Sequence, residues 1–270
     1  MGLDPSSPQM TLLLVMLHTG TMFAVIAYFW RQWRQSYFAT VNAFKRFALR
    51  LVYATALTGV VGEALIKLVE HTMFKGAPKA EIEDLFGRLD MVAPALACAG
   101  ILILIAGLRE KKLDAVSAAQ AAAASLTRRP TDSVTMRQAG WMGLLQGLAL
   151  PFRGFSRSGA TISTGMLTGA TKQRAERFSF AMAVVITPAA IGREAMRLLH
   201  ATHAAAATGS PIDLHGTLLF SLLGAVFAFL AGLVALKWLS NWLENGRWYW
   251  FGIYCLVASC VVFYLHTKGY

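Results

Sequence analysis

Six long apolar segments constrain the fold of this chain more than any other feature of its sequence. Each has roughly the 20 residues that an α-helix needs to cross the hydrocarbon core of a bilayer. Hydrophobic residues make up 56% of the chain and charged residues only 14%, which is too apolar for a water-soluble domain. The sequence therefore predicts an all-α, polytopic membrane helix bundle, folded as a single integral membrane domain over residues 1–270. The six segments are Thr11 to Trp30, Phe47 to Val69, Met91 to Leu108, Phe178 to Leu198, Thr217 to Leu239 and Trp248 to His266.

The net charge of +11 indicates how these segments are oriented, and no nucleic-acid partner is expected. Basic residues cluster between the apolar segments, where the positive-inside rule places them in the cytoplasm, and no nucleic-acid-binding motif accompanies them. One cluster, interpreted as a cytoplasmic loop, follows the first segment, whereas residues 75–90 are acidic and read as an external loop. The cluster consists of Arg31, Arg34, Lys45, Arg46 and Arg50.

Several other side chains have an ordinary structural interpretation. Glu63 and Lys67 are spaced to form an ion pair one helical turn apart; the alternative is a charge that faces a cavity. Cys98, Cys255 and Cys260 have neither a disulfide nor a metal-site spacing and are interpreted as small core side chains. Two aromatic groups at segment ends are interpreted as belts at the membrane interface. They are Tyr28, Trp30 and Trp33, and Trp248, Tyr249 and Trp250.

Residues 138–171 depart from the pattern of full-length spans. Two apolar arms of about 13 residues, each too short to cross a bilayer alone, flank an interruption that contains Pro151, Gly154 and Gly159. Short, interrupted apolar segments are typical of re-entrant pairs, whose irregular turn is tolerated only against protein or water. The sequence therefore predicts a re-entrant helical hairpin at about 138–171, entered from the cytoplasmic side.

The turn of this hairpin carries two arginines, Arg153 and Arg157, and three hydroxyls, on Ser156, Ser158 and Thr161. A guanidinium offers a planar fork of donors that suits phosphate oxygens. The residues after the turn can open a helix, whose free N–H groups and dipole favour an anion. Because such groups are costly at membrane depth, they predict a phosphate site. The alternative is that these groups have a purely structural role within the membrane.

These residues resemble the signature P-G-x-S-R-S-x-x-T of the undecaprenyl pyrophosphate phosphatases, the bacitracin-resistance family. The similarity continues through Gln146 to Leu150 before the turn and Phe178 to Phe180 after it, and the order of apolar segments is also similar. One position departs from the signature, because Arg153 stands where the family usually has proline. The matching residues are Gly154, Ser156, Arg157, Ser158 and Thr161.

The resemblance implies hydrolysis of undecaprenyl diphosphate to undecaprenyl phosphate and phosphate, which recycles the cell-wall carrier and confers bacitracin resistance. On this hypothesis Arg157 clamps the diphosphate, while the hydroxyls of Ser156, Ser158 and Thr161 donate hydrogen bonds to it. Gly154 and Gly159 allow the backbone to approach the substrate, and Arg153 adds a second clamp. The protein is expected to be multi-pass in the bacterial inner membrane, with its site reached from the external side.

His18 lies near the middle of the first apolar segment, where the resemblance places a glutamine. An intramembrane histidine is a candidate for substrate binding, and a packed, hydrogen-bonded histidine is the alternative. The polyprenyl diphosphate lipid and the membrane are the expected partners, and a homodimer is left open.

The resemblance also implies a second motif, E/Q-x-x-x-E followed by P-x-S-S-x-x-H, whose glutamates are associated with a divalent cation, Mg²⁺ or Ca²⁺. The sequence does not match it, since Pro5, Ser6 and Ser7 are only a faint echo, and no metal ligand is assigned. A late start site, a truncation, or a paralogue that binds lipid phosphate without cleaving it would each explain this, and the first is preferred. The 270 residues are therefore expected to be weakly active or inactive, and a polyprenyl-phosphate transporter or flippase is the alternative function.

Overall fold

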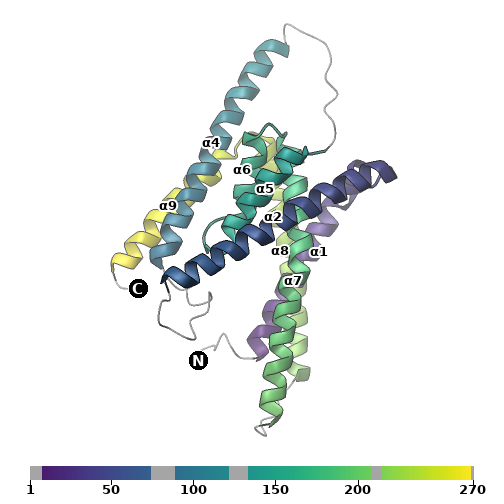
Figure 1. Cartoon of the computed structure of the whole chain (residues 1–270), viewed down its shortest axis with the longest axis vertical. Helices are drawn as coiled ribbons and strands as arrows, with labels where there is room; N and C mark the ends of the chain where they lie inside the picture. Colours follow the sequence, from purple (N-terminus) through teal and green to yellow (C-terminus); the bar gives the residue numbers. More distant parts are fainter. Residues whose placement is uncertain (1–7, 74–88, 122–132, 208–213, 269–270) are drawn as a thin grey trace. The chain divides into compact units, whose positions relative to one another are not determined.

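The computed structural model describes residues 8–73, 89–121, 133–207 and 214–268, which form eight α-helices and no β-strand (Figure 1). Four helices precede residue 150 and four follow it. They are α1 (Pro8–Ser36), α2 (Val41–Met73), α4 (Leu89–Ala121), α5 (Met136–Ala149), α6 (Arg157–Leu167), α7 (Lys172–Ala207), α8 (Leu214–Glu244) and α9 (Tyr249–Thr267).

Six of these helices, α1, α2, α4, α7, α8 and α9, are long and apolar enough to cross a membrane. They coincide with the six predicted segments and confirm the all-α, polytopic membrane bundle. The other two, α5 and α6, are the two arms of the predicted hairpin, with 14 and 11 residues. Entry of this hairpin from one side of the membrane stays a prediction.

The chain divides into two compact units, so the expectation of a single membrane domain stays a prediction. The first unit holds residues 1–34 and 180–240, and the second holds residues 35–179 and 241–270. In the first unit, α1 packs on α8 where Gly20 meets the backbone of Ala225. The ring of Phe29 on α1 stacks on that of Phe180 on α7, with centroids 5.0 Å apart.

In the second unit, close helix contacts are made through small residues, as membrane helices require when burial against lipid gains nothing. Gly143 and Gly147 of α5 lie directly against the backbone of α2. There the Thr58 hydroxyl donates to the carbonyl oxygen of Gly143 at 2.9 Å. In the same unit α4 packs along α9 (Figure 1), and Ser259 Oγ donates to the Ala93 carbonyl at 2.7 Å.

The basic cluster after the first segment is not a loop throughout, because α2 begins at Val41. The hydroxyl of Thr40 accepts from the backbone N–H of Ala43 at 3.1 Å, which satisfies one of the free donors at a helix start. Lys45, Arg46 and Arg50 therefore lie on the first turns of a helix.

The aromatic-belt interpretation is wrong for Trp33 and Trp248. Trp33 is 6% exposed and stacks on Phe29 with centroids 5.8 Å apart, and Trp248 is 2% exposed. Trp30 and Trp250 are exposed, as residues of a belt should be. Position at the end of an apolar segment does not reveal which of two neighbouring tryptophans turns inward.

The other structural interpretations have mixed outcomes. The ion pair is confirmed, since Lys67 Nζ lies 3.4 Å from Glu63 Oε1 on the exposed face of α2. All three cysteines are free, and Cys255 is buried as expected. The core interpretation is wrong for Cys98 and Cys260, which are exposed. An apolar side chain on a membrane helix can face lipid as well as a core.

Candidate functional site

The first arm of the hairpin, α5, begins at a capping box. The Thr135 hydroxyl accepts from the backbone N–H of Gln138, and the Gln138 side chain accepts from the N–H of Thr135. This reciprocal pair satisfies two donors that a helix start leaves unpaired. The helix ends beside the motif, where the N–H of Leu150 donates to the Gly147 carbonyl. With 14 residues, α5 separates the base of the hairpin from its tip by about 20 Å.

The tip is a tight turn that requires glycine. The N–H of Phe155 donates to the Phe152 carbonyl at 3.2 Å, and Gly154, the third residue of this turn, has φ +91°. Positive φ at that position is typical of a type II turn. A Cβ at Gly154 would also lie only 3.0 Å from the carbonyl oxygen of Val92 on α4. The turn is therefore fixed both by its own conformation and by contact with α4.

The second arm, α6, starts with the residues that the sequence assigns to phosphate binding. Ser156 is its N-cap, and its hydroxyl accepts from the N–H of Gly159 at 3.1 Å. This cap leaves the N–H groups of Arg157 and Ser158 without carbonyl partners inside the helix. The side chain of Arg157 is exposed and Ser158 is half-buried. A helix N-terminus beside a guanidinium forms an electropositive site that suits an anion.

Two more predicted residues lie at the same tip. Arg153 is exposed on the turn. Gly159 is buried in the first turn of α6, where a Cβ would lie 2.7 Å from the Ile103 side chain on α4. Gly159 therefore lets α6 approach α4 closely, and the tip is formed by the turn and the first residues of α6 resting on α4.

The side chain of Thr161 is buried and makes its contacts within the protein. It is 1% exposed, and its hydroxyl lies 2.9 Å from the Arg157 carbonyl and 2.5 Å from the hydroxyl of Ser179. Ser179 is itself buried, at the end of the α7 segment that belongs to this unit. Thr161 thus anchors α6 to α7, and direct contact of its hydroxyl with a substrate stays a prediction that this geometry does not favour.

The base of the hairpin is held by a different set of bonds. Gly169, with φ +93°, ends α6 in a Schellman motif, where the N–H of Ala170 donates to Gly165 O and that of Gly169 to Met166 O. Gln138 Nε2 donates to the Thr168 carbonyl at 3.2 Å and closes the two arms. A second helix supports this end, since Arg109 of α4 donates to the Leu167 carbonyl at 3.2 Å.

The middle of α6 is fixed by a buried polar contact with the segment before α9. The indole Nε1 of Trp248 donates to Ser163 Oγ at 2.9 Å, and both side chains are buried. A buried hydroxyl or indole N–H without a partner costs about 1–3 kcal/mol. The Trp248–Ser163 contact therefore defines the position of α6 in the second unit.

The structure brings together seven of the eight predicted site residues. Arg157, Ser156 and Ser158 lie at the start of α6, with Gly154 and Arg153 on the turn, and Thr161 and Gly159 behind them. His18 lies apart in sequence on α1 of the first unit, where it is exposed and its Nδ1 is 2.8 Å from the Leu14 carbonyl. The role of His18 in substrate binding stays a prediction.

Sequence reasoning missed the residues that hold the hairpin in place. Gln138 could have been found, because a threonine followed three residues later by glutamine is the capping-box pattern. Ser179 lies in the stretch that carries the family resemblance, but no sequence rule pairs it with Thr161. Trp248 and Ser163 are 85 residues apart, and no local pattern predicts their contact.

Comparison with known proteins then decides the family. The family model described as bacitracin resistance protein BacA matches residues 1–261. The chain belongs to the BacA family. This membership confirms the resemblance carried by the α6 N-terminus.

Three relatives of this BacA-family chain bear related names. It is 52% identical over 263 residues to undecaprenyl-diphosphatase 2 of Acinetobacter baylyi, covering 97% of this chain and 86% of the relative. It is 32% identical over 264 residues to undecaprenyl-diphosphatase 2 of Burkholderia thailandensis, covering 96% and 82%. The same identity holds over 268 residues with undecaprenyl-diphosphatase 1 of Burkholderia pseudomallei, also covering 96% and 82%.

Proposed function

We propose that this protein hydrolyses undecaprenyl diphosphate to undecaprenyl phosphate and inorganic phosphate. Weak activity of the 270 residues, expected because the second motif is not matched, stays a prediction. The observation that carries the proposal is the N-terminus of α6, where the exposed Arg157 follows the Ser156 cap in a BacA-family chain. Two relatives named undecaprenyl-diphosphatase 2 support the choice of substrate. The six span-capable helices supply the apolar surroundings that the lipid tail requires.

The reaction requires the protein mainly to position the diphosphate and to stabilise the charge of the transition state. The bond between the bridging oxygen and the terminal phosphorus breaks, water supplies the new oxygen of the released phosphate, and the bridging oxygen leaves with undecaprenyl phosphate. In the proposal, Arg157 and the free N–H groups of Arg157 and Ser158 bind the equatorial oxygens of the terminal phosphoryl group, whose charge is spread in the transition state.

The hydroxyls have unequal parts in this proposal. Ser156 Oγ already accepts a bond from Gly159, but its proton remains available for donation to a phosphate oxygen. Ser158 is half-buried beside it and donates in the same way. Thr161 holds the helix through Ser179, and Arg153 adds positive charge at the entrance of the site.

The hairpin residues fit the anionic head of the substrate and do not fit a metal ion. They supply hydroxyls and guanidinium groups, whereas Mg²⁺ and Ca²⁺ prefer carboxylate and carbonyl oxygens. No group of three or more His, Cys, Asp or Glu residues that could hold a metal occurs in the part of the chain that the structure describes. A divalent cation remains our proposal from the resemblance, and chelation followed by readdition of Mg²⁺ or Ca²⁺ during turnover tests it.

We also place the protein in the bacterial inner membrane, with the hairpin tip accessible from the external side. The positive charge of the stretch around Lys45 and Arg46 supports a cytoplasmic position for the base of the hairpin. Bacitracin resistance would follow, since hydrolysis removes the diphosphate lipid on the face where bacitracin sequesters it. A homodimer remains open.

Phosphate release in detergent tests the proposed reaction. Arg157→Ala should lower turnover of undecaprenyl diphosphate by on the order of 100-fold or more, as loss of a transition-state donor does, and Arg157→Lys should recover part of it. Arg137→Ala is the matched control, because Arg137 is an exposed arginine in the first turn of α5.

Equal turnover of Arg157→Ala and Arg137→Ala would overturn the assignment of the site. Detergent micelles have no inside and outside, so turnover there also separates hydrolysis from transport. A parent chain that releases no phosphate but moves the lipid across sealed vesicles would favour the flippase alternative, which the interrupted α5–α6 pair also resembles.

A further inference from the structure

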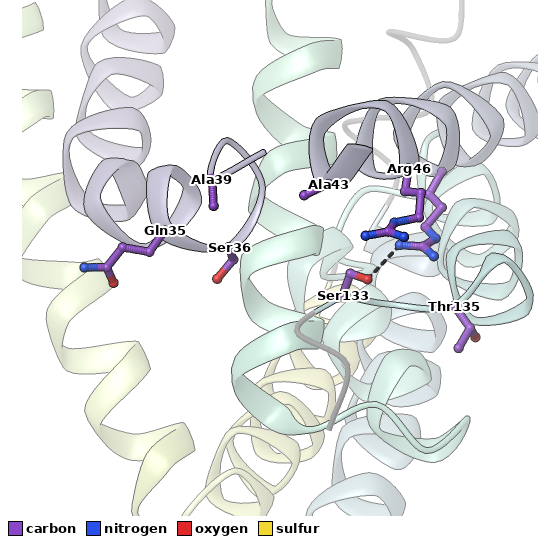
Figure 2. Close-up of a pocket in the computed structure, with 8 residues that line it drawn as sticks. Gln35, Ser36, Ala39, Ala43, Arg46, Ser133 and Thr135 are labelled. Carbon is purple, nitrogen blue, oxygen red and sulfur yellow. Dashed lines mark hydrogen bonds between the residues drawn. The ribbon is translucent and has the colours of Figure 1, made fainter. Parts of the chain in front are cut away.

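A basic pocket of about 540 Å³ lies where α5 begins, at the base of the hairpin (Figure 2). Its wall is built from the start of α2, the end of α1 and the segment before α5. Ala43, Arg46 and Arg50 come from α2, Ser36 from α1, and Ser133 and Thr135 from the segment before α5.

The arginines in and near its wall make the pocket electropositive. Arg46 and Arg50 are one helical turn apart on α2, where two like charges repel each other. A third guanidinium reaches the wall, because Arg177 Nη1 donates to Ser36 Oγ at 2.9 Å. None of the described residues that line the pocket is acidic. Thr135 caps the N-terminus of α5, whose dipole adds further positive potential.

Two hydroxyls hold this charge in place. Ser133 Oγ accepts from Arg50 Nη1 at 2.7 Å, the bond drawn as a dashed line in Figure 2. The single hydroxyl of Ser133 orients the Arg50 guanidinium and leaves most of its donors for another partner. A phosphate group offers the oxygens and the negative charge that such a wall lacks.

The pocket is separate from the site at the hairpin tip. It lies at the first residue of α5, and the tip lies beyond the last, which places about 20 Å of helix between them. None of its lining residues takes part in the proposed hydrolysis. A ligand here is therefore additional to the substrate.

Apolar side chains beside the pocket suit a ligand whose phosphate group is attached to a lipid. Phe38, Val41 and Phe44 are exposed, and the rings of Phe38 and Phe44 stack with centroids 5.5 Å apart. They lie next to or near Ala39 and Ala43 in the chain, which line the pocket. A charged pocket flanked by exposed apolar groups suits an amphiphile at a membrane surface.

We propose that this pocket binds the phosphate of an anionic phospholipid. The lipid belongs to the leaflet that the positive-inside rule predicts to be cytoplasmic. Its acyl chains would lie against the exposed face of α2. This proposal stands independently of the proposed hydrolysis.

Native mass spectrometry of the full chain in detergent tests it with phosphatidylglycerol as the probe and phosphatidylcholine as the neutral comparison. The parent chain should retain phosphatidylglycerol preferentially. Arg46→Gln with Arg50→Gln should weaken retention by roughly tenfold or more, as removal of two membrane-facing arginines does. Ala43→Leu, which fills the pocket without changing charge, should weaken it as well.

Lys45→Gln with Arg31→Gln is the matched control, because it removes two exposed positive charges that do not line the pocket. If this control loses as much lipid as the pocket variant, retention reflects net charge and the proposal is overturned. Displacement of the lipid by an equal concentration of inorganic phosphate would show a free-phosphate site and overturn the lipid assignment. The Arg157→Ala variant should retain phosphatidylglycerol like the parent, which separates this test from that of the hydrolysis.

Discussion

At the scale of single residues, the candidate site combines a few exposed side chains with several buried ones. Arg157 is exposed at the start of α6, whereas Thr161, four residues on, is buried against Ser179. Both match the family signature, so a motif match alone does not distinguish a residue that contacts substrate from one that positions the helix. The contacts of Thr161 with Arg157 and Ser179 support a positioning role, and its contact with the substrate stays a prediction.

The Thr161–Ser179 contact gives a direct test of this distinction. Thr161→Val and Ser179→Ala should each destabilise the protein by about 1–2 kcal/mol, because each substitution removes the hydrogen bond between the two buried hydroxyls and leaves the remaining hydroxyl without it. If Thr161 acts only through Ser179, the two variants should lower phosphate release to similar extents, and the double variant should add little. A much larger loss of turnover in Thr161→Val, at similar melting temperatures, would instead show that Thr161 touches the substrate.

The turn residue Gly154 gives a second prediction. Gly154→Ala should destabilise the protein by about 1–2 kcal/mol from its positive φ alone, with a further loss from the contact with Val92. Turnover should fall with it, since the turn places Arg157. Gly59→Ala is the control, because a Cβ at Gly59 on α2 meets nothing within 4 Å. Thermal unfolding that places the two variants at the same melting temperature would contradict the described turn.

At the scale of helices, the sequence predicted what length and composition control. The six span-capable helices and the two short arms follow from the number of apolar residues available to each. The start of α2 was missed because Thr40 caps a helix before the apolar run begins. The inward turn of Trp248 was missed because its partner, Ser163, is distant in sequence. The residues of the candidate site share one local motif and could be named from the sequence, and their role stays a prediction. The contacts that hold the candidate site could not be predicted.

The buried indole of Trp248 links the segment before α9 to α6 through Ser163. Trp248→Phe should lower the stability of the protein by about 1–2 kcal/mol, since Ser163 loses a buried partner. Trp250→Phe should change it little, because Trp250 is exposed. Melting temperatures in the same detergent compare the two. A larger shift for Trp250→Phe would contradict the place of Trp248 in the structure.

At the scale of the whole molecule, charge and hairpin together predict an orientation. The basic start of α2 is predicted in the cytoplasm, and the exposed pair of Glu63 and Lys67 lies near its other end. That pair is a surface salt bridge, worth at most about 1 kcal/mol, so its residues can be replaced without loss of fold. Both ends of α2 are thus available as markers of the two sides of the membrane.

Single-cysteine labelling in a background without Cys98, Cys255 and Cys260 measures this orientation. In intact cells, a membrane-impermeant maleimide should react with Lys67→Cys and not with Lys45→Cys. Disruption of the membrane should make Lys45→Cys reactive. The reverse pattern in intact cells would invert the predicted orientation of α2.

The central claim is that the N-terminus of α6 holds the diphosphate head, and a structure of the protein with a non-hydrolysable methylene-diphosphonate analogue of the lipid tests it most directly. The measured quantity is the distance from the terminal phosphonate oxygens to the Arg157 guanidinium and to the backbone nitrogen of Ser158. We predict both distances to be about 3 Å, within hydrogen-bond range. A head group bound elsewhere, with neither group in contact, would contradict the claim.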